Sequence, residues 1–296
     1  MKNLTYKIPA ENEKGFINQY QEDIYLITEF KYSYGNTWPL YAKSLELIEK
    51  SDHSDALILL HGGGPDHHSL IPLGKQLAGI HTVILPDIRG YGSSICADSS
   101  LHTWVQYAND VRALMNTIKA PTAIVGGAGL GSTISLRTAL AYPDRVKALV
   151  LISVEDIEDD NAKKLEIAFM EDFASRVRNL GIEKAWEPIL KDLSPIIESM
   201  VRDAIPRSNP ESIAAAAAIG YDRSFRNIKE LSTIFVPTLI IPGMDWRHPI
   251  TLAKELAKIL PKGYLASVTF SENLKTEEDF ANCFAPIIQN FLSQRL

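Results

Sequence analysis

The segment Gly126-Gly127-Ala128-Gly129-Leu130-Gly131 has the spacing of a turn that displays one catalytic side chain. An apolar run at 122–125 precedes it and a helical pattern at 132–142 follows it, which predicts a strand, a tight turn and a helix. A turn of this type, with small residues on both sides of a nucleophile, exposes that nucleophile for attack on a carbonyl carbon. Gly129 is the centre of the one frame whose flanking residues are both small. Glycine accepts the strained backbone of such a turn but offers no atom that can attack.

Other reactive side chains lie on loops at the carboxyl ends of predicted strands, where open α/β sheets place their sites. They are Asp66, His67, His68, Asp245 and His248. His248 can act as a base on a bound water, or the pair His248-Pro249 can simply begin the next helix. Two histidines and two carboxylates also suit a divalent metal, although no helical His-x-x-x-His spacing supports one. We therefore expect no metal site.

Apolar runs alternate with amphipathic helices over most of the chain, which predicts a mostly parallel sheet flanked by helices. The expected core strands are 56–60, 82–86, 122–126, 147–152, 237–242 and 264–270. Two edge strands, 24–30 and 40–45, are expected before them, with a turn at Gly35-Asn36. Residues 155–230 interrupt the alternation with four helical segments. The predicted organisation is a core of residues 1–154 and 231–296 with a helical cap at 155–230.

Four motifs together resemble the α/β-hydrolase family, in its esterase- and lipase-like branch with a helical cap. They are the turn around Gly129 with the helix that closes on Tyr142-Pro143-Asp144-Arg145-Val146, the glycines after strand 56–60, the run Asp87-x-Arg89-Gly90-x-Gly92-x-Ser94, and the loop Gly243-x-Asp245-x-x-His248-Pro249. The resemblance covers about residues 55–295. It implies the α/β-hydrolase fold and a carboxylic-ester hydrolase type of site.

By that resemblance, Gly63 and Leu130 supply the backbone N–H groups of an oxyanion hole, with Gly64 beside them, and Asp245 takes the acid position. The family order is Ser, then acid, then His, with the His after the last strand. Here Gly129 replaces the Ser, and none of the seven histidines follows 248. Phe280 is the residue placed nearest to the family His, with Glu272 and Asn273 as alternatives.

The triad is therefore expected to be degenerate, and Ser-type ester or amide hydrolysis to be impaired. On this interpretation Gly129→Ser alone does not restore activity, because no imidazole would take the proton of the new hydroxyl.

The first functional hypothesis is a protein that binds a small, partly apolar molecule beneath the cap. Its contacts would come from Gly63 and Gly64 at the expected oxyanion hole and from His67, Trp246 and His248. The alternative is a hydrolase or lyase that acts on a small carbonyl or ester substrate through relocated residues, Asp245, His248 and His67. A third hypothesis is an interaction protein that uses a surface and no pocket.

The composition and net charge disfavour two kinds of partner, nucleic acid and anionic membranes. The chain has 296 residues, 46% of them hydrophobic, and a net charge of -6, which disfavours nucleic acid and anionic membranes. It contains no run of 18 apolar residues, and Met1–Gly15 is polar, unlike a signal peptide. With two isolated cysteines, Cys96 and Cys283, the expected location is the cytoplasm. No cofactor is expected, and the sequence is compatible with a homodimer.

Overall fold

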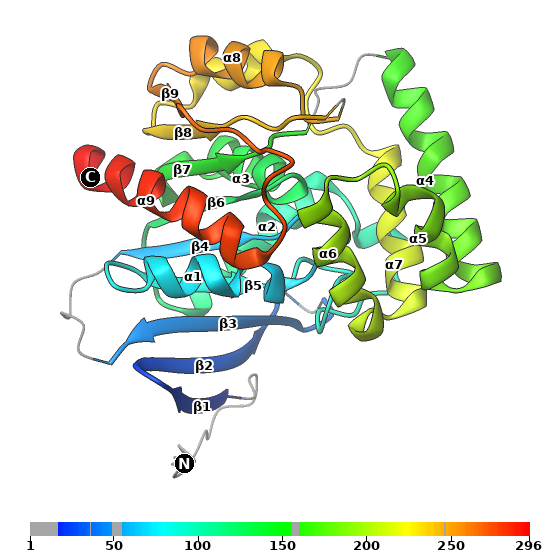
Figure 1. The fold of residues 1–296 in the computed structure, drawn as a ribbon, viewed down its shortest axis with the longest axis horizontal. Helices are drawn as coiled ribbons and strands as arrows, with labels where there is room; N and C mark the ends of the chain where they lie inside the picture. The colour runs from blue at the N-terminus through cyan, green and yellow to red at the C-terminus, as the bar shows by residue number, and fades with distance from the viewer. Residues whose placement is uncertain (1–16, 36, 49–54, 156–159, 246) are drawn as a thin grey trace.

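The computed structural model describes residues 17–35, 37–48, 55–155, 160–245 and 247–296. Its centre is a nine-stranded sheet in the order β1-β2-β3-β5-β4-β6-β7-β8-β9 (Figure 1). The strands are β1 (Ile17–Glu22), β2 (Tyr25–Tyr32), β3 (Leu40–Leu47), β4 (Ala56–Leu60), β5 (Thr82–Pro86), β6 (Ala123–Ala128), β7 (Val146–Ile152), β8 (Thr238–Ile241) and β9 (Gly263–Leu265). Neighbours from β5 to β9 are parallel, whereas β1, β2 and β3 pair antiparallel and β3 joins β5 antiparallel. The expected mostly parallel α/β sheet is confirmed.

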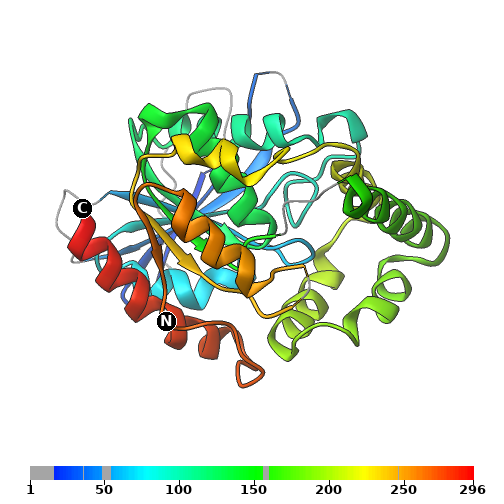
Figure 2. The same ribbon diagram turned by 90° about the horizontal axis from the view of Figure 1, so that it is seen from above.

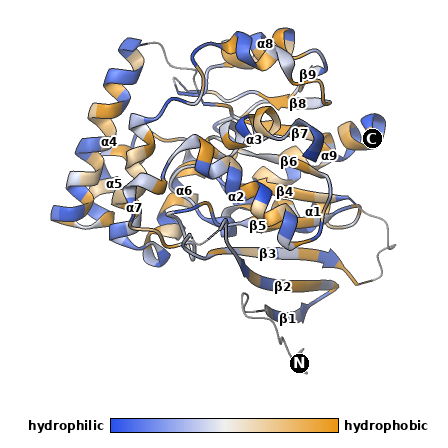
Figure 3. Ribbon diagram, turned by 180° about the vertical axis from the view of Figure 1, so that it is seen from behind, coloured by the Kyte–Doolittle hydropathy of each residue, from blue (hydrophilic) through white to orange (hydrophobic). Residues whose placement is uncertain are grey.

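Helices cover both faces of the sheet because the central strands are apolar on both sides. On one face lie α1 (Ile71–Leu77) and α9 (Glu277–Arg295), and on the other α2 (Trp104–Thr117), α3 (Leu130–Ala141) and α8 (Ile250–Ile259). Figure 3 shows apolar colour on the central strands and mixed colour along the outer helices. The two apolar layers hold the carboxyl ends of the parallel strands in fixed positions.

Two edges of the sheet differ from the sequence prediction. Strand β1 was not expected, because its sequence is mostly polar and it pairs as an outer edge with β2. Strand β9 ends at Leu265 and not near 270. Beyond it, the N–H of Ala266 donates to Ile240 and that of Phe270 to Pro242, so the chain still follows β8 without a regular ladder. In the expected turn, Gly35 has a φ of 59°, while Asn36 lies outside the described residues.

The helical cap packs around its own small core. It contains α4 (Asp160–Leu180), α5 (Ile182–Leu190), α6 (Pro195–Ala204), the 3₁₀ turn η4 (Ile205–Arg207) and α7 (Pro210–Ala216). Phe173, Val177, Ile182 and Ile213 form the centre of that core. Figure 2 shows the cap helices gathered at one end of the sheet, on the side opposite the carboxyl terminus. The described part of 155–230 adds no strand to the sheet, while the exact division into domains stays a prediction.

Candidate active site

The turn around Gly129 has the geometry that the sequence predicts. Gly129 follows β6 directly, precedes α3, and has φ 51° and ψ −117°. Its N–H donates to the carbonyl of Ile152 at 3.0 Å, and its own carbonyl accepts from Ser132 and Thr133 in the first turn of α3. A side chain at this position would be strained, which glycine avoids. The positive φ predicted for Gly129 is confirmed.

An imidazole faces Gly129. A Cβ built on Gly129 would lie 3.4 Å from Nε2 of His248. The other ring nitrogen, Nδ1, lies 2.8 Å from Oδ1 and 3.0 Å from Oδ2 of Asp245. A serine hydroxyl at position 129 would extend from that Cβ and so come within reach of Nε2. The expectation that no imidazole serves position 129 is therefore wrong.

The loop after β8 explains how this pair forms. His248 follows Asp245 by three positions, and its N–H closes a turn on the carbonyl of Asp245 at 3.2 Å. Oδ1 of Asp245 also accepts the N–H groups of Arg247 and His248. Burial raises the pKa of Asp245, but the hydrogen bond and charge of His248 and these N–H groups outweigh it and hold the pKa below its ordinary value. The carboxylate thus stays ionised and orients the ring.

The glycine loop after β4 lies next to the start of α3. A Cβ built on Gly63 would lie 3.9 Å from Cβ of Leu130 and 4.0 Å from the hydroxyl of Tyr91. Leu130 begins α3, so its N–H has no acceptor inside the helix. Gly64, with φ 111°, lies under Trp186 of the cap. Gly63 and Leu130, the residues expected as oxyanion donors, are thus neighbours, and Gly64 follows Gly63 in the same loop.

A cavity of about 420 Å³ lies between the cap and these loops. Its polar border includes Gly129, Asp245 and His248, together with Ser153 and Tyr91. Burial, with the charge of Glu155, raises the pKa of Tyr91, so its hydroxyl remains a donor. The remaining wall is largely apolar and includes Phe169, Met170, Phe173, Trp186, Ile189, Leu193, Ile197, Met200, Ile213, Phe270 and Phe280. Trp246, expected at this site, lies outside the described residues.

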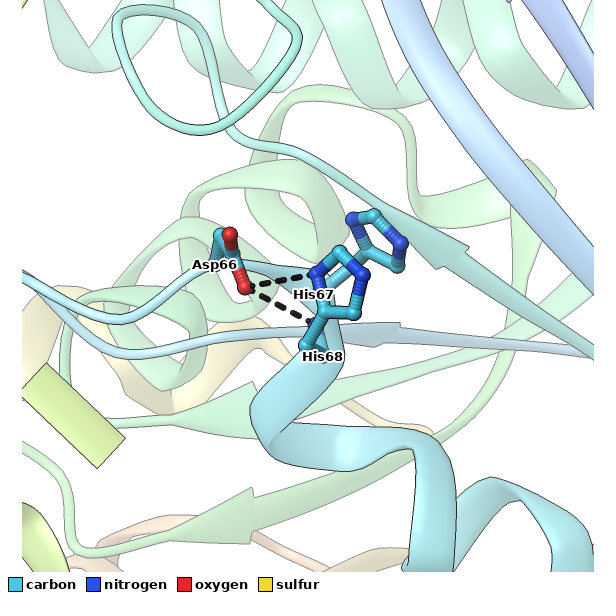
Figure 4. Close-up of side chains that lie close together, drawn as sticks. All are labelled: Asp66, His67 and His68. Atoms are coloured by element: carbon cyan, nitrogen blue, oxygen red, sulfur yellow. Dashed lines mark hydrogen bonds and ion pairs between the residues drawn. The ribbon is translucent and has the colours of Figure 1, made fainter. Parts of the chain in front are cut away.

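His67 does not join the site. It is 3% exposed, is absent from the cavity wall, and binds Oδ1 of Asp87 through Nδ1 at 2.8 Å. Its neighbour His68 pairs with Asp66 instead, as the dashed lines in Figure 4 show. The sequence prediction for His67 is wrong because the chain enters the 3₁₀ turn η1 (His67–Leu70) at this point, which directs the side chain of His67 towards β5.

The cluster of Asp66, His67 and His68 is arranged as a network of hydrogen bonds and an ion pair. The ring centroids of the two imidazoles are 4.1 Å apart with planes at 36°, and one nitrogen of each ring and one oxygen of Asp66 lie within 4.8 Å of one another. Nε and a terminal nitrogen of Arg207, from η4 of the cap, bind the two oxygens of Asp66 at 2.7 and 3.2 Å. The guanidinium thus already supplies a cation to the Asp66 carboxylate. The cluster connects the core to the cap.

A second hollow of about 600 Å³ opens between α4, α7 and the segment 99–103. Its one imidazole, His102, uses Nδ1 on the Tyr107 hydroxyl at 2.9 Å and Nε2 on the carbonyl of Cys96 at 3.1 Å. Burial lowers the pKa of His102 to about 4. With both nitrogens bonded, this histidine has no atom free for chemistry, and the reactive groups gather in the smaller cavity.

A profile of the alpha/beta hydrolase fold matches residues 55–268. The chain belongs to the alpha/beta hydrolase fold family. Among curated relatives, an epoxide hydrolase from Caballeronia sordidicola is 40% identical over 75 residues, which is 25% of this chain and 23% of that protein. The match thus spans less than a quarter of the relative. A 2-hydroxymuconate semialdehyde hydrolase from Pseudomonas putida is 24% identical over 80% of this chain and 86% of its own.

Solved structures of other alpha/beta hydrolases share the fold. The enol-lactonase from Burkholderia xenovorans LB400 superposes with a TM-score of 0.72 at 20% identity, over 88% of this chain and 99% of that one. A thermophilic esterase from Thermogutta terrifontis gives a TM-score of 0.68 at 20% identity, over 89% and 97%. Across the described part of this alpha/beta hydrolase, no helix has the length and apolarity needed to cross a bilayer.

The sequence analysis did not name Ser153 among the candidate residues of the site in this alpha/beta hydrolase. Ser153 borders the cavity, directly after the last residue of β7. One signal was available, since a hydroxyl residue at the carboxyl end of a buried parallel strand lies where open α/β sheets place their ligands.

Proposed function

We propose that this alpha/beta hydrolase cleaves a small, largely apolar ester or related carbonyl compound by general-base catalysis, with water in place of a serine nucleophile. One observation carries the proposal. Nε2 of His248 lies 3.4 Å from the Cβ position of residue 129, while Nδ1 is bonded to Asp245. The imidazole is thus oriented as a base toward the point from which a nucleophile attacks.

The proposed reaction needs only side chains, backbone N–H groups and water. Nε2 of His248 accepts a proton from water, and the water oxygen bonds to the carbonyl carbon of the substrate. The carbonyl electrons move to its oxygen, which accepts hydrogen bonds from the N–H groups of Gly63 and Leu130. The imidazolium, stabilised by Asp245, then returns the proton to the leaving oxygen as the bond to carbon breaks.

The cavity supports a small apolar substrate. Its volume of about 420 Å³ and its aromatic and aliphatic wall suit a molecule with one carbonyl group held at the polar end. Curated relatives named as a methyl ester esterase and a semialdehyde hydrolase support hydrolysis of a carbonyl compound, whereas others are named as an epoxide hydrolase and a fluoroacetate dehalogenase.

The test is turnover of p-nitrophenyl acetate and p-nitrophenyl butyrate by the unaltered protein and by His248→Asn. The asparagine amide can still donate to Asp245, but it removes the base. We expect kcat/KM to fall by about 10²- to 10⁴-fold. His68→Gln is the matched control, because its side chain is partly exposed and lies outside the cavity wall. An equal loss in both variants, or none in His248→Asn, contradicts the proposal.

A second candidate is a binding protein without turnover, and the glycine at position 129 favours it. In that case the esters are not hydrolysed by the unaltered protein above the rate in buffer. A non-hydrolysable ligand such as butyrate or a short-chain ketone would still raise the melting temperature. The combination of binding without hydrolysis would replace the first proposal with the second.

A further inference from the structure

Ser153 has a backbone conformation that serine rarely adopts. Its φ is 55°, in the left-handed region, although it has a Cβ. The other described residues of this kind, Asp23 and Lys119, lie in connections away from the cavity, after β1 and after α2. Ser153 is 8% exposed and borders the cavity. Strained residues that line a cavity are candidates for function.

Backbone hydrogen bonds hold Ser153 between the turn around Gly129 and the end of β8, next to the loop that carries Asp245 and His248. Its N–H donates to Ile241 of β8 at 2.8 Å, next to the loop that carries Asp245 and His248. The preceding carbonyl, of Ile152, accepts the N–H of Gly129 at 3.0 Å. The position of Ser153 is therefore determined by backbone contacts to the turn around Gly129 and to the end of β8, which leads into the loop that carries Asp245 and His248.

The hydroxyl of Ser153 lies close to the proposed base. A Cβ built on Gly243 would lie 2.5 Å from Oγ of Ser153 and 2.5 Å from Cβ of His248, so those two atoms are separated by no more than twice that distance. Within the described chain, Oγ has no protein hydrogen-bond partner. The hydroxyl is thus available to a molecule in the cavity.

We infer that Ser153 is a catalytic residue that holds the attacking water beside His248. This inference rests on the proposed function. One hydrogen of the water is donated to Nε2 of His248 and the other to Oγ of Ser153, which leaves an oxygen lone pair for the carbonyl carbon. As the bond to carbon forms, the first proton passes to Nε2, while Ser153 keeps its own proton and is unchanged by the reaction.

The first test compares Ser153→Ala, which removes the hydroxyl and keeps the strain, with Ser153→Gly, which removes both. We expect both variants to lower kcat for p-nitrophenyl acetate at least tenfold with little change in KM. Ser153→Gly should also raise the melting temperature. Lys119→Gly is the control, because it relieves a similar φ of 57° at an exposed turn and should raise the melting temperature without altering kcat. Full activity in Ser153→Gly would overturn the inference.

A second set of variants, all carrying Gly129→Ser, separates this inference from the proposed function. In Gly129→Ser the nucleophile is a side chain, so acylation releases p-nitrophenol without water and deacylation alone requires it. Adding Ser153→Ala should preserve the rapid burst of p-nitrophenol and slow the steady phase at least tenfold. An unchanged steady phase, or a burst lost in parallel with it, would overturn the role of Ser153. Failure of the unaltered protein to hydrolyse the ester would refute only the proposed function.

Discussion

Two histidine–carboxylate pairs in this molecule have the same spacing and different surroundings. Nδ1 of His248 lies 2.8 Å from Oδ1 of Asp245, and Nδ1 of His67 lies 2.8 Å from Oδ1 of Asp87. Nε2 of His248 faces the cavity near Gly129. Nε2 of His67 is buried and has no partner among the described residues. Under the proposed function, the surroundings of the far nitrogen, and not the spacing of the pair, distinguish the catalytic pair from the structural one.

The second pair joins loops. Asp87 is fully buried and accepts hydrogen bonds from the N–H and Nδ1 of His67 and from the N–H of Ser93. These bonds connect the turn after the glycine loop to the turn after β5. We therefore propose a structural role for the His67–Asp87 pair and a chemical role for the His248–Asp245 pair.

The largest expected effect is on turnover in Asp245→Asn. The amide no longer stabilises the imidazolium or selects the tautomer with Nε2 free, so kcat/KM for p-nitrophenyl acetate should fall by about 10³-fold. Asp87→Asn is the matched change in the other pair. It should lower the free energy of unfolding while the kcat of the folded fraction stays within twofold of the unaltered value. A loss of kcat in Asp87→Asn with a loss of stability alone in Asp245→Asn would contradict the proposed roles of the two pairs.

The next effect is on stability, in His67→Ala and His248→Ala. Removing the buried His67 leaves a cavity and takes one donor from a buried carboxylate, which should cost about 2–4 kcal/mol. Removing His248, which lines an open cavity, should cost less than about 1 kcal/mol. Urea unfolding followed by circular dichroism measures both. Equal losses would show that the two histidines are equally structural.

The smallest effect is a pH dependence of stability from Asp66. Burial raises the pKa of Asp66, but the bonds to His68 and Arg207 outweigh it and hold the pKa far below its ordinary value. A lowered folded-state pKa stabilises the protein above the unfolded value of about 3.9, and this stability is lost as the pH falls below it. Asp66→Asn should lower the free energy of unfolding at pH 7 by about 1–2 kcal/mol and flatten its fall as the pH drops below about 4. An equally steep fall in the variant would assign the acid sensitivity to other carboxylates.

The sequence predicted the fold well because buried parallel strands are continuous apolar runs, as β4, β5 and β7 show. It missed β1, whose polar residues carry no such pattern, and it extended β9 into a segment that has no regular ladder. In both cases edge pairing, and not composition, decides the structure.

For the site, the sequence identified the loops but not the directions of their side chains. It placed Gly129 and Asp245 by their motifs. It expected the family base after the last strand, and it named His248 only as a relocated base in the alternative hypothesis. His248 reaches position 129 from the acid loop itself, through a turn closed on Asp245. By residue type His67 is as suitable a base as His248, but its ring binds Asp87. Such directions depend on local turns and packing that residue types do not specify.

The central claim is that the imidazole of His248 serves position 129, and it can be tested without a natural substrate. A fluorophosphonate reacts with a serine hydroxyl that an adjacent base activates. In Gly129→Ser we predict rapid labelling, located by mass spectrometry on the peptide that contains residue 129. In Gly129→Ser combined with His248→Asn, the labelling rate should fall by at least about 10²-fold. Equal labelling of both proteins, or no labelling of either while both remain folded, would contradict the account.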